Sequence, residues 1–351
     1  MSVFALGIEL DGEGSHPAAW RRAHHPPSES LSGRTLAQKV RAAENAGFTL
    51  ATFDDSIVPP HAGLRARVDA VNRASFVAAA TSTIGLVPVV ETTYAEPFHT
   101  SSQLATLDYT SRGRGGWIAA RVADPAAARA WGRTALTDGA DLDREQRDSI
   151  TVVRDLWDSW EDDAVVRDYA SGRFLDRDKL HYVDFEGETF TVKGPAIVPR
   201  PPQGQLVVLG TEADRELVDV VLVNEPDRNA AVDAASRSDG LTFIEIAVTL
   251  DTPGTSATER LAALNEYERG QSSRLEYVGP ATGFVELLTG LAAHTDGVRL
   301  FPTVIDEDLP VLARYVLPAL FKSGVAHRPV PGSSLRGNLG LSRPANRHAR
   351  V

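Results

Sequence analysis

Short apolar runs alternate with amphipathic segments along most of the chain. The apolar runs have the length and composition of buried strands, and they cover residues 4–10, 49–53, 84–90, 116–122, 206–209, 218–223, 243–250 and 298–304. The amphipathic segments have the helical spacing of three and four residues, and they cover residues 36–46, 66–81, 98–109, 144–160, 227–236, 257–268, 284–294 and 309–321. Strands that alternate with helices favour a parallel sheet with helical crossovers. We therefore predict an α/β fold, a closed (β/α)8 barrel, with a doubly wound open sheet as the alternative.

Local signals mark the ends of the first helix and a bend in the last one. Thr35 and Gln38 have the spacing of a capping box at the start of residues 36–46, and Gly47 is placed to end that helix. Pro318 lies inside residues 309–321, where its missing N–H and its ring predict a kink.

The regular alternation breaks in residues 161–204, a stretch too long for a structureless loop in a compact domain. Residues 179–185 and 189–193 alternate apolar and polar positions around a Glu-Gly-Glu turn, which predicts an inserted β-hairpin. We interpret this insertion as a lid. The end of the chain, residues 332–351, is rich in Pro, Gly and Arg and is predicted to wrap over the surface. Residues 1–351 are thus interpreted as one domain.

The composition narrows the class of protein. The formal net charge is −11, and an acidic surface repels nucleic acid and anionic membranes. The chain has no cysteine, which excludes disulfides, thiolate metal sites and a cysteine nucleophile. No apolar run reaches the roughly 18 residues of a membrane span, and the N-terminus lacks the pattern of a signal peptide. We expect a cytoplasmic protein without a nucleic-acid or membrane partner.

Several common catalytic motifs are absent from the sequence. No G-x-G-x-x-G opens a helix after a strand, and there is no P-loop, G-x-S-x-G or H-E-x-x-H. The acidic cluster Asp158, Glu161, Asp162 and Asp163 could suggest a site for a hard cation. A run of charges at a helix end is more often solvated, so we predict no metal site.

Three stretches carry a resemblance to a known family. The first is EPFHTSSQLATLDYTSRGRGGW at residues 96–117. The second joins LWDSWEDD at 156–163 with GRFLDRDKLH at 172–181 and PRPPQG at 199–204, and the third is VLPAL at 316–320. Together they resemble the luciferase-like monooxygenase superfamily, in the branch around nitrilotriacetate and alkanesulfonate monooxygenases.

The resemblance implies a TIM barrel that binds reduced FMN at the carboxyl ends of its strands. It also implies a separate flavin reductase as partner, O2 and a small organic molecule as substrates, and a homodimer or homotetramer. Two alternatives stay open. One is a deazaflavin-dependent enzyme that transfers hydride on the same barrel. The other is a degenerate barrel that binds a ligand or a partner subunit without turnover, and Ile118, where this branch often has a polar residue, motivates it.

Polar residues gather where the predicted strands end, which is where barrel enzymes carry their active sites. The resemblance places Asp55 near the flavin ring and Thr92 and Thr93 against it, while His16 and Arg121 are positioned to reach a substrate. The predicted catalytic residues are His16, Asp55 and Arg121, and the predicted flavin contacts are Asp55, Ser56, Glu91, Thr92, Thr93, Gly210 and Thr211.

The loop after residues 206–209 departs from the family pattern. In the family it commonly has a serine-rich run for the FMN phosphate, whereas here Thr211 is followed by Glu212, Ala213 and Asp214. A carboxylate beside a phosphate opposes binding by about 1 kcal/mol per contact at water-like screening. Thr211 and backbone N–H groups at a helix start could still hold a phosphate. The sequence thus predicts flavin affinity that is weakened, altered or lost.

Other prominent residues of the resembling stretches are interpreted as structural. Trp117 and Trp157 are predicted to lie in the core, and His99 is predicted to cap or pack against the start of its helix. Arg114 is predicted to pair with a carboxylate.

Overall fold

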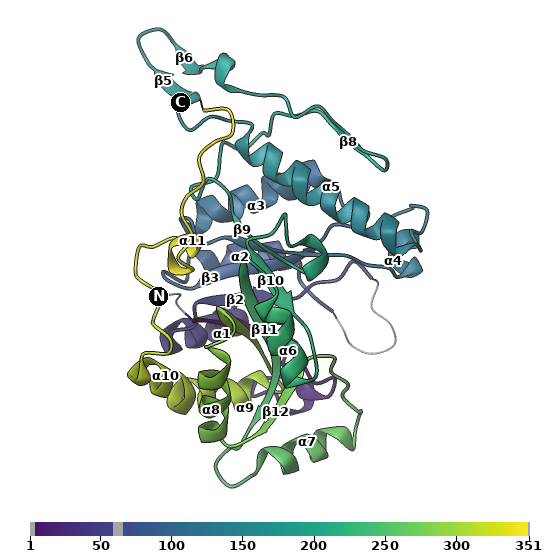
Figure 1. Ribbon diagram of the computed structural model, residues 1–351, viewed down its shortest axis with the longest axis vertical. Coiled ribbons are helices and arrows are strands. Elements are labelled where there is room, and N and C mark those ends of the chain that lie inside the picture. The colour runs from purple at the N-terminus through teal and green to yellow at the C-terminus, as the bar shows by residue number, and fades with distance from the viewer. Residues whose placement is uncertain (1–3, 59–65, 350–351) are drawn as a thin grey trace.

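The protein is described by a computed structural model that covers residues 4–58 and 66–349. Within these residues, eight parallel strands close into a barrel (Figure 1). Their order around the barrel is β1 (Ala5–Glu9), β2 (Leu50–Phe53), β3 (Gly85–Glu91), β4 (Gly116–Ala120), β9 (Val207–Gly210), β10 (Val220–Val223), β11 (Leu241–Leu250) and β13 (Gly297–Pro302). Parallel pairing of β1 with β13 and of β10 with β11 closes the ring. The predicted closed barrel is confirmed, and the open sheet is wrong.

A further strand extends one side of the barrel wall. β12 (Leu275–Gly279) pairs with residues 246–250 of β11, while β10 pairs with residues 241–244 of the same strand. β12 therefore takes over the edge of β11 where β10 ends. The sequence pattern did not predict it, because a five-residue strand that is half exposed has little apolar signal.

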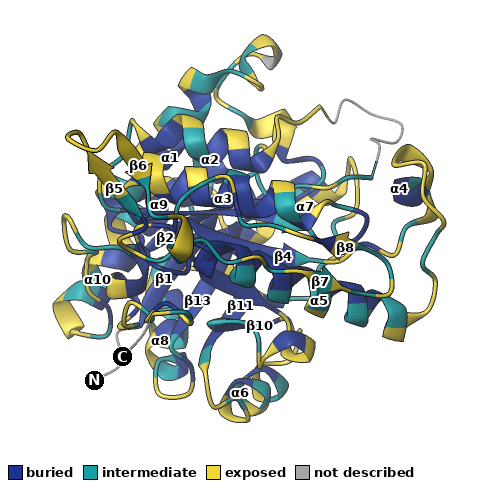
Figure 2. Cartoon of the chain, turned by 90° about the horizontal axis from the view of Figure 1, so that it is seen from above, coloured by how far each residue is buried: buried dark blue, intermediate teal, exposed yellow. Residues whose placement is uncertain are grey.

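Helices surround the barrel and cover the outer faces of its strands (Figure 1). Figure 2 shows buried residues along the strands at the centre and exposed residues on the outward sides of the helices. The helices are α1 (Gly33–Ala46), α2 (Ala70–Ala78), α3 (Pro97–Ser111), α4 (Pro125–Ala130), α5 (Gly139–Asp158), α6 (Arg228–Ser236), α7 (Ala257–Asn265), α8 (Ala281–Leu291), α9 (Ile305–Val311), α10 (Leu317–Ser323) and α11 (Leu335–Asn338). None of the helices in the described part of the chain has the length and apolarity to cross a membrane.

The ends of α1 differ partly from the prediction. Its N-cap is Ser32, whose side chain accepts a hydrogen bond from the N–H of Arg34, so the predicted capping box at Thr35 is wrong. Gly47 ends the helix as predicted, with a left-handed φ of 100° that favours glycine. Near the end of the chain, a π-helical turn, η5 (Leu312–Val316), joins α9 to α10. It lies just before Pro318, where the sequence predicts a kink.

The alternation of side chains along each strand separates two apolar cores. Ala5, Leu50, Val87 and Phe243 belong to the cluster that fills the inside of the barrel. The alternate positions, such as Leu6 next to Ala5, belong to the larger cluster between the strands and the helices. Because side chains of a strand point in turn to its two faces, strands such as β1 and β2 contribute to both cores, whereas the outward residues of β4 and β9, such as Trp117 and Val208, belong to a third cluster.

The C-terminal segment fills the amino-terminal end of the barrel. α11 brings Leu335 and Leu339 into the inner cluster, and both are buried. Leu335 lies against Gly85 and Gly116, the first residues of β3 and β4. The prediction that this segment wraps over the surface is therefore wrong for α11, whereas residues 340–349 are mostly exposed or partly exposed. The few apolar residues of this segment cover the open end of the barrel core, which would otherwise face water.

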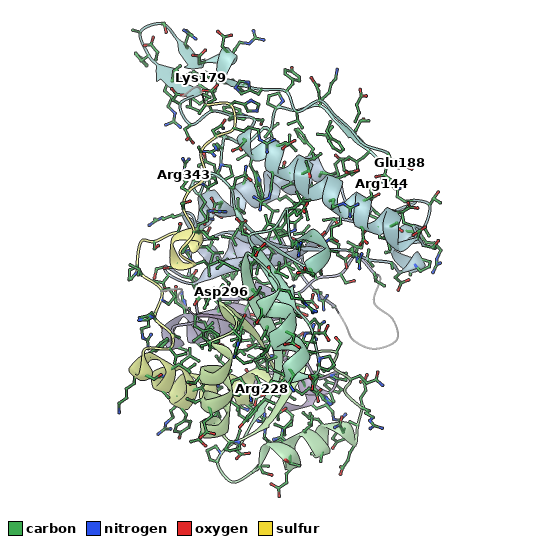
Figure 3. The ribbon with its side chains drawn as sticks, viewed as in Figure 1. Arg144, Lys179, Glu188, Arg228, Asp296 and Arg343 are labelled. Carbon is green, nitrogen blue, oxygen red and sulfur yellow. The ribbon has the colours of Figure 1, made fainter. Side chains whose placement is uncertain are left out.

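The insertion after α5 contains two hairpins. The predicted one is present but short, β7 (Phe185–Glu186) and β8 (Thr191–Val192), and it follows an unpredicted one, β5 (Val165–Asp168) and β6 (Arg173–Leu175). Their apolar side chains pack with Val152, Leu156 and Trp160 on the outside of α5 and just after it. Only the tip of the second hairpin reaches the start of α5, where Glu188 lies 3.0 Å from Arg144 (Figure 3). That the insertion acts as a lid stays a prediction, and it applies to the tip of this second hairpin.

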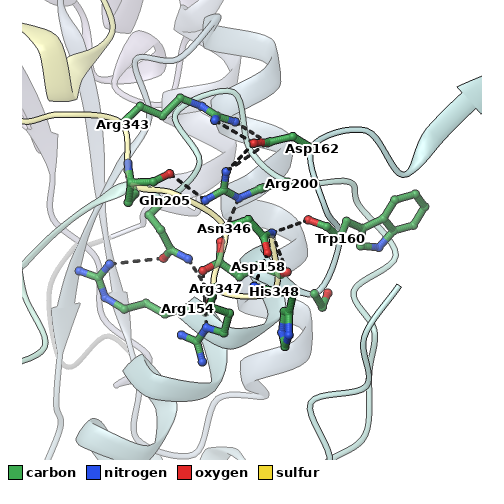
Figure 4. A network of polar contacts seen from close by, with 12 residues as sticks. Arg154, Asp158, Trp160, Asp162, Arg200, Gln205, Arg343, Asn346, Arg347 and His348 are labelled. Atoms are coloured by element: carbon green, nitrogen blue, oxygen red, sulfur yellow. Dashed lines mark hydrogen bonds and ion pairs between the residues drawn. The ribbon is translucent and has the colours of Figure 1, made fainter. Parts of the chain in front are cut away.

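Ion pairs join the insertion to the C-terminal segment (Figure 4). The buried guanidinium of Arg200 lies 2.9 Å from Asp158 and 3.0 Å from Asp162. Arg343 binds Asp162 from the other side at 2.6 Å, and hydrogen bonds from Arg343 and Arg200 lower the pKa of Asp162 to about 2. Asn346 donates to the carbonyl oxygen of Asp158 at 2.9 Å. Asp158 and Asp162 of the acidic cluster are therefore bound by arginines, in contrast to the solvated run that the sequence suggests, whereas Asp163 pairs with Lys179 and is 72% exposed.

Candidate active site

A buried ion-paired network lies inside the carboxyl end of the barrel. Glu9, Thr52, Glu245 and Arg299 come from β1, β2, β11 and β13, and all four are buried. Arg299 donates to Glu9 at 2.5 Å, to Glu245 at 2.7 Å and to Thr52 at 2.9 Å. Burial opposes the ionisation of Glu9, but the charge and hydrogen bond of Arg299 and the hydroxyl of Thr52 outweigh it and hold the pKa of Glu9 below its ordinary value. We call the carboxyl end of the barrel its mouth, and these four residues form the floor of the mouth.

Sequence reasoning missed this floor, although a signal for it exists. Glu9, Glu245 and Arg299 are each a charged residue within a strand that is otherwise almost entirely apolar. A charge is costly to bury unless it has a partner of opposite sign. Lone charges within apolar strands therefore indicate a shared site, even though the sequence does not say which charges pair.

The predicted residues after β2 and β3 lie together at the rim of the mouth. Glu91, the last residue of β3, accepts a hydrogen bond from the N–H of Ile57 at 2.8 Å and another from the Ser56 side chain. Asp55 is also at this rim, but it binds the start of α2, where its Oδ2 accepts from the N–H of Ala70 at 2.5 Å. Asp55 thus has a structural task here, and its contact with a flavin stays a prediction.

The neighbouring Asp54 is a second acid at the mouth, and sequence reasoning missed it. Its backbone N–H donates to Glu9 at 3.0 Å, which places it directly above the floor. Water reaches its side chain, yet the surrounding rim removes part of its hydration. This partial burial and then the negative charge of Glu9 raise the pKa of Asp54 to about 6. A carboxyl that titrates near neutrality can hold or release a proton at this position.

Thr92 and Thr93 connect the ends of β3 and β4. The Thr92 hydroxyl donates to the carbonyl oxygen of Ala120 at 3.0 Å, and the Thr93 hydroxyl accepts from the N–H of Val122 at 3.1 Å. Both residues are buried. Their hydroxyls are therefore used by the backbone of the next strand, and their contact with a flavin stays a prediction.

His16 lies on the opposite side of the mouth, away from the rim acids. It is buried, its Nδ1 accepts from the N–H of Ala18 at 3.1 Å, and its Nε2 lies 3.2 Å from Oδ1 of Asn265 after α7. Because Nδ1 accepts, Nε2 carries the hydrogen and donates it to Asn265. Both ring nitrogens are thus occupied, and a role for His16 in catalysis would require one of these bonds to break.

Arg121 follows β4 and lies with the start of α5. It forms an ion pair with Asp143, and the two side chains are 42% and 33% exposed. The pair is open to water, so its electrostatic attraction is weak. Arg121 can therefore exchange partners, and its predicted contact with a substrate anion stays a prediction.

The loop of Gly210 and Thr211 is lined by carboxylates. The Thr211 hydroxyl donates to Asp214 at 2.9 Å, and the Gln146 amide donates to the same oxygen at 2.5 Å. Asp214 is buried, and no lysine or arginine among the described residues forms an ion pair with it. Glu145, next to Gln146 on α5, is also buried, and its Oε2 has no hydrogen-bond partner within residues 4–58 and 66–349. The loop therefore presents acceptors and negative charge where a phosphate would need donors.

The long signature stretch that carries the resemblance is mostly structural. Trp117 and Trp157 lie in the core with their rings edge to face and 6.4 Å apart, as predicted. The prediction that Arg114 pairs with a carboxylate is wrong, because its guanidinium donates to backbone carbonyl oxygens, among them that of Ile84 at 2.7 Å. Asp108 is buried and accepts from the Gln203 amide at 2.6 Å, and burial raises its pKa to about 6.

One group of side chains has the composition of a metal site. Potential ligand atoms of Glu13, His25 and Asp306 lie within 4.8 Å of one another. The Lys39 ammonium, however, lies 2.5 Å from Glu13, and His25 lies 2.9 Å from the other oxygen of the same carboxylate. The carboxylate of Glu13 is thus already bound by Lys39 and His25, and we assign no metal to the cluster.

A hollow of about 440 Å³ lies beside the mouth, between the loop after β1 and helix α7. It is lined by Trp20, Arg21 and Tyr267, among others, and the Arg21 guanidinium lies 3.7 Å from the centre of the Tyr267 ring. The hollow is distinct from the floor and the rim, because none of their residues lines it.

Comparison with known proteins agrees with this architecture. A family model described as luciferase-like monooxygenase matches residues 15–221. The chain is 33% identical to a pristinamycin IIA synthase subunit of Streptomyces pristinaespiralis, over 90% of this chain and 91% of that protein. It is 26% identical to N-acetyl-S-(2-succino)cysteine monooxygenase of Bacillus subtilis (strain 168), over 98% of both chains.

A solved structure shares the fold over almost the full length. EDTA monooxygenase from Chelativorans sp. BNC1 superposes with a TM-score of 0.78 at 18% identity, and the match covers 98% of this chain and 99% of that one. The barrel fold, the family model and these two relatives all indicate the same family. The chain therefore belongs to the luciferase-like monooxygenase family and is a flavin-dependent oxidoreductase of that family.

Proposed function

We propose that this chain is the oxygenase component of a two-component system. It receives reduced FMN from a separate flavin reductase and uses O2 to oxygenate a small organic molecule at the carboxyl end of the barrel. When bound, a reduced flavin supplies the two electrons with which one oxygen atom of O2 enters the substrate and the other leaves as water. The chain's own residues bind and orient the flavin and the substrate, and they exclude water from the reaction.

One observation carries the proposal: the mouth combines an apolar wall with acids that can hold a proton. Val89 and Ala120 face the mouth from β3 and β4, next to Glu91 at the rim. A flat tricyclic ring can lie on such small apolar side chains, while its polar edge meets Asp54 and Glu91. Burial raises the pKa of Glu91, and the pKa of Asp54 is raised to about 6, so Asp54 can take up or release a proton near neutral pH.

The phosphate end of FMN fits less well than the ring. The loop of Gly210 and Thr211 is the counterpart of the family's phosphate loop, and there Asp214 and Glu145 are buried carboxylates. We propose that the ring supplies most of the affinity and that the phosphate contributes little. Weak binding suits a reduced flavin that arrives by diffusion from a reductase and leaves oxidised after each turnover.

We propose a homodimer or homotetramer that buries the apolar side chains of the insertion. Tyr169, Phe174, Tyr182 and Ile197 are between 58% and 101% exposed in the single chain. Exposed apolar side chains that gather on one segment are typical of an interface. A partner barrel of another sequence is the alternative, since the name of the pristinamycin relative describes one subunit of an enzyme.

A flavin titration tests the function. The purified protein is titrated without oxygen with reduced FMN, reduced riboflavin and reduced deazaflavin, and then mixed with O2 while substrate loss is followed. We expect saturable binding of reduced FMN and riboflavin, and O2 consumption that depends on an added reductase. Tight binding of the deazaflavin with no need for O2 would indicate hydride transfer instead. A folded protein that binds none of the three would be a barrel without flavin chemistry.

A further inference from the structure

One arginine at the mouth is held in place but has unused donors. Arg274 lies just before β12, and its guanidinium carbon is 3.8 Å from the centre of the Phe301 ring. Its Nε lies 3.3 Å from Glu245, an ion pair with the floor of the mouth. Its side chain is 30% exposed, whereas those of Glu245 and Arg299 are 6% exposed. Arg274 is therefore the solvent-facing end of the buried network.

The loop that carries Arg274 is fixed by hydrogen bonds. The Ser272 hydroxyl accepts from the backbone N–H of Arg274 at 3.0 Å. Asn224, the residue after β10, exchanges hydrogen bonds with the Ser273 hydroxyl at 3.1 and 3.2 Å. Together with the pairing of β12 on β11, these contacts position the guanidinium before any ligand arrives.

The charged residues of the floor form a series of alternating sign, and Arg274 is its last member. Glu9 binds Arg299, Arg299 binds Glu245, and Glu245 lies against Arg274. Arg299 uses Nε, Nη1 and Nη2 in hydrogen bonds to its neighbours. Arg274 has an ionic contact at Nε, and its two terminal nitrogens form no hydrogen bond or ion pair with any residue in the described ranges. Two carboxylates and two guanidiniums balance, so an added anion meets a neutral network with open donors.

We propose that Arg274 anchors a carboxylate of the substrate, so that the substrate is a small organic anion. The inference rests on the proposed function and names the substrate class of the same site. A guanidinium forms two parallel hydrogen bonds with a carboxylate, and it does so best when its plane is held in advance. Here the ring of Phe301 and the carboxylate of Glu245 hold that plane.

The arrangement also orients the substrate across the mouth. Asp54 and Glu91 stand on the side of β2 and β3, whereas Arg274 stands on the side of β11 and β13. A carboxylate is attracted to Arg274 and repelled by the acids opposite. The anionic end of the substrate therefore lies toward Phe301, and its uncharged, reacting end lies toward Val89 and Ala120.

Equilibrium binding of two probes tests the anchor without any turnover. Succinate is the anionic probe and succinamide its uncharged counterpart, and both are titrated into the protein by calorimetry with and without bound FMN. The variants are Arg274→Gln, which removes the charge, and Arg274→Lys, which keeps the charge but loses the planar fork. Arg269→Gln is the matched control, because Arg269 lies in the same loop and is exposed. Thermal unfolding of each variant shows that it is folded.

We expect wild type to bind succinate more tightly than succinamide. Arg274→Gln should weaken succinate binding by about tenfold or more, the range of hydrogen bonds to charged groups. Arg274→Lys should weaken it less, Arg269→Gln should not change it, and succinamide binding should be the same in all four proteins. Equal binding of the two probes, no binding of either, or an Arg274→Gln variant that binds succinate as wild type does would overturn the inference. Because the assay needs neither O2 nor a reductase, its failure is separate from a failure of the monooxygenase proposal.

Discussion

The side chain of Leu335 occupies the space beside Gly85, so closely that a Cβ on Gly85 would lie 2.6 Å from Leu335 Cδ1. The two residues are 250 positions apart, and they meet inside the amino-terminal end of the barrel. Gly116 on the neighbouring strand leaves similar room, with a Cβ position 3.0 Å from Leu335 Cδ2. The glycines at the start of β3 and β4 and the leucine of α11 thus form one packed unit that closes the barrel from below.

Leu335→Ala should therefore destabilise the protein strongly. The side chain is completely buried, and replacing a buried leucine by alanine costs about 2–5 kcal/mol in lost burial and cavity formation. Urea unfolding followed by tryptophan fluorescence measures the change in the free energy of unfolding. Leu31→Ala is the control, because Leu31 is 51% exposed and should change stability by less than about 0.5 kcal/mol. Equal effects of the two substitutions would show that α11 does not plug the barrel.

Arg200 and Arg343 bind the same carboxylate but should differ in their contribution to stability. Arg200→Met leaves the buried carboxylate of Asp158 without its nearest cation, which costs about 3–5 kcal/mol. Arg343→Met removes an ion pair whose two side chains are 47% and 49% exposed, which costs about 1 kcal/mol or less. Urea unfolding of both variants measures the difference. If Arg343→Met were the more damaging change, the geometry in Figure 4 would be wrong.

Asp54→Asn should change how stability depends on pH. The folded-state pKa of Asp54 is raised to about 6 from an ordinary value of 3.8, so the folded protein binds the proton more tightly than the unfolded chain. The stability from this group is fully present below about pH 4 and is lost as the pH rises through 6. The stability of Asp54→Asn minus that of wild type should therefore increase between pH 4.5 and 7.

Asp55→Asn provides the comparison for that experiment. Asp55 accepts a hydrogen bond from the start of α2, and asparagine keeps an oxygen that can accept the same bond, so Asp55→Asn should change stability by about 1 kcal/mol or less. Unfolding free energies of the three proteins across the pH range measure both effects, and parallel curves for wild type and Asp54→Asn would contradict the raised pKa.

Asp214→Asn should improve the binding of FMN relative to riboflavin. The two flavins differ only in the phosphate, and the substitution removes a buried negative charge while the new amide keeps an oxygen for Thr211 and Gln146. One such charge opposes a phosphate by about 1 kcal/mol, so the ratio of the two dissociation constants should shift about fivefold toward FMN. Quenching of flavin fluorescence measures both constants. Glu212→Gln, at an exposed carboxylate paired with Arg215, should shift the ratio less, and an unchanged ratio in Asp214→Asn would place the phosphate elsewhere.

The fold could be predicted from the sequence because each strand and helix has its own pattern of apolar and polar residues. Strands such as β11 are apolar on both faces, whereas helices such as α1 have a single apolar face. The sequence therefore reveals the type and the order of the elements. Gly47 could be placed at the end of α1 because few other residues adopt its φ. The capping box at Thr35 failed for a related reason, since Ser32 offered an equally good cap three residues earlier.

The candidate site could be predicted only in part. Asp55 and Glu91 were found at the mouth because they follow predicted strands, whereas Glu9 and Arg299 lie inside strands and carry no local sign of their partner. Arg274 stood in a segment with no predicted element, since β12 forms only when β11 offers an edge. The resemblance predicts that Thr211 belongs to a phosphate loop, and only the packing of α5 showed that Asp214 and Glu145 are buried beside it.

The sequence by itself determined the alternation of strands and helices, the barrel class and the family, because these depend on patterns that repeat within a few residues. Only the tertiary structure decided which charges pair, that α11 closes the amino-terminal end of the barrel and that the insertion lies along α5. Glu9 and Arg299 are 290 positions apart, and a periodic pattern reports which face of an element is buried but not what is buried against it. Closure of the barrel brings those faces together and thereby assembles the floor of the mouth.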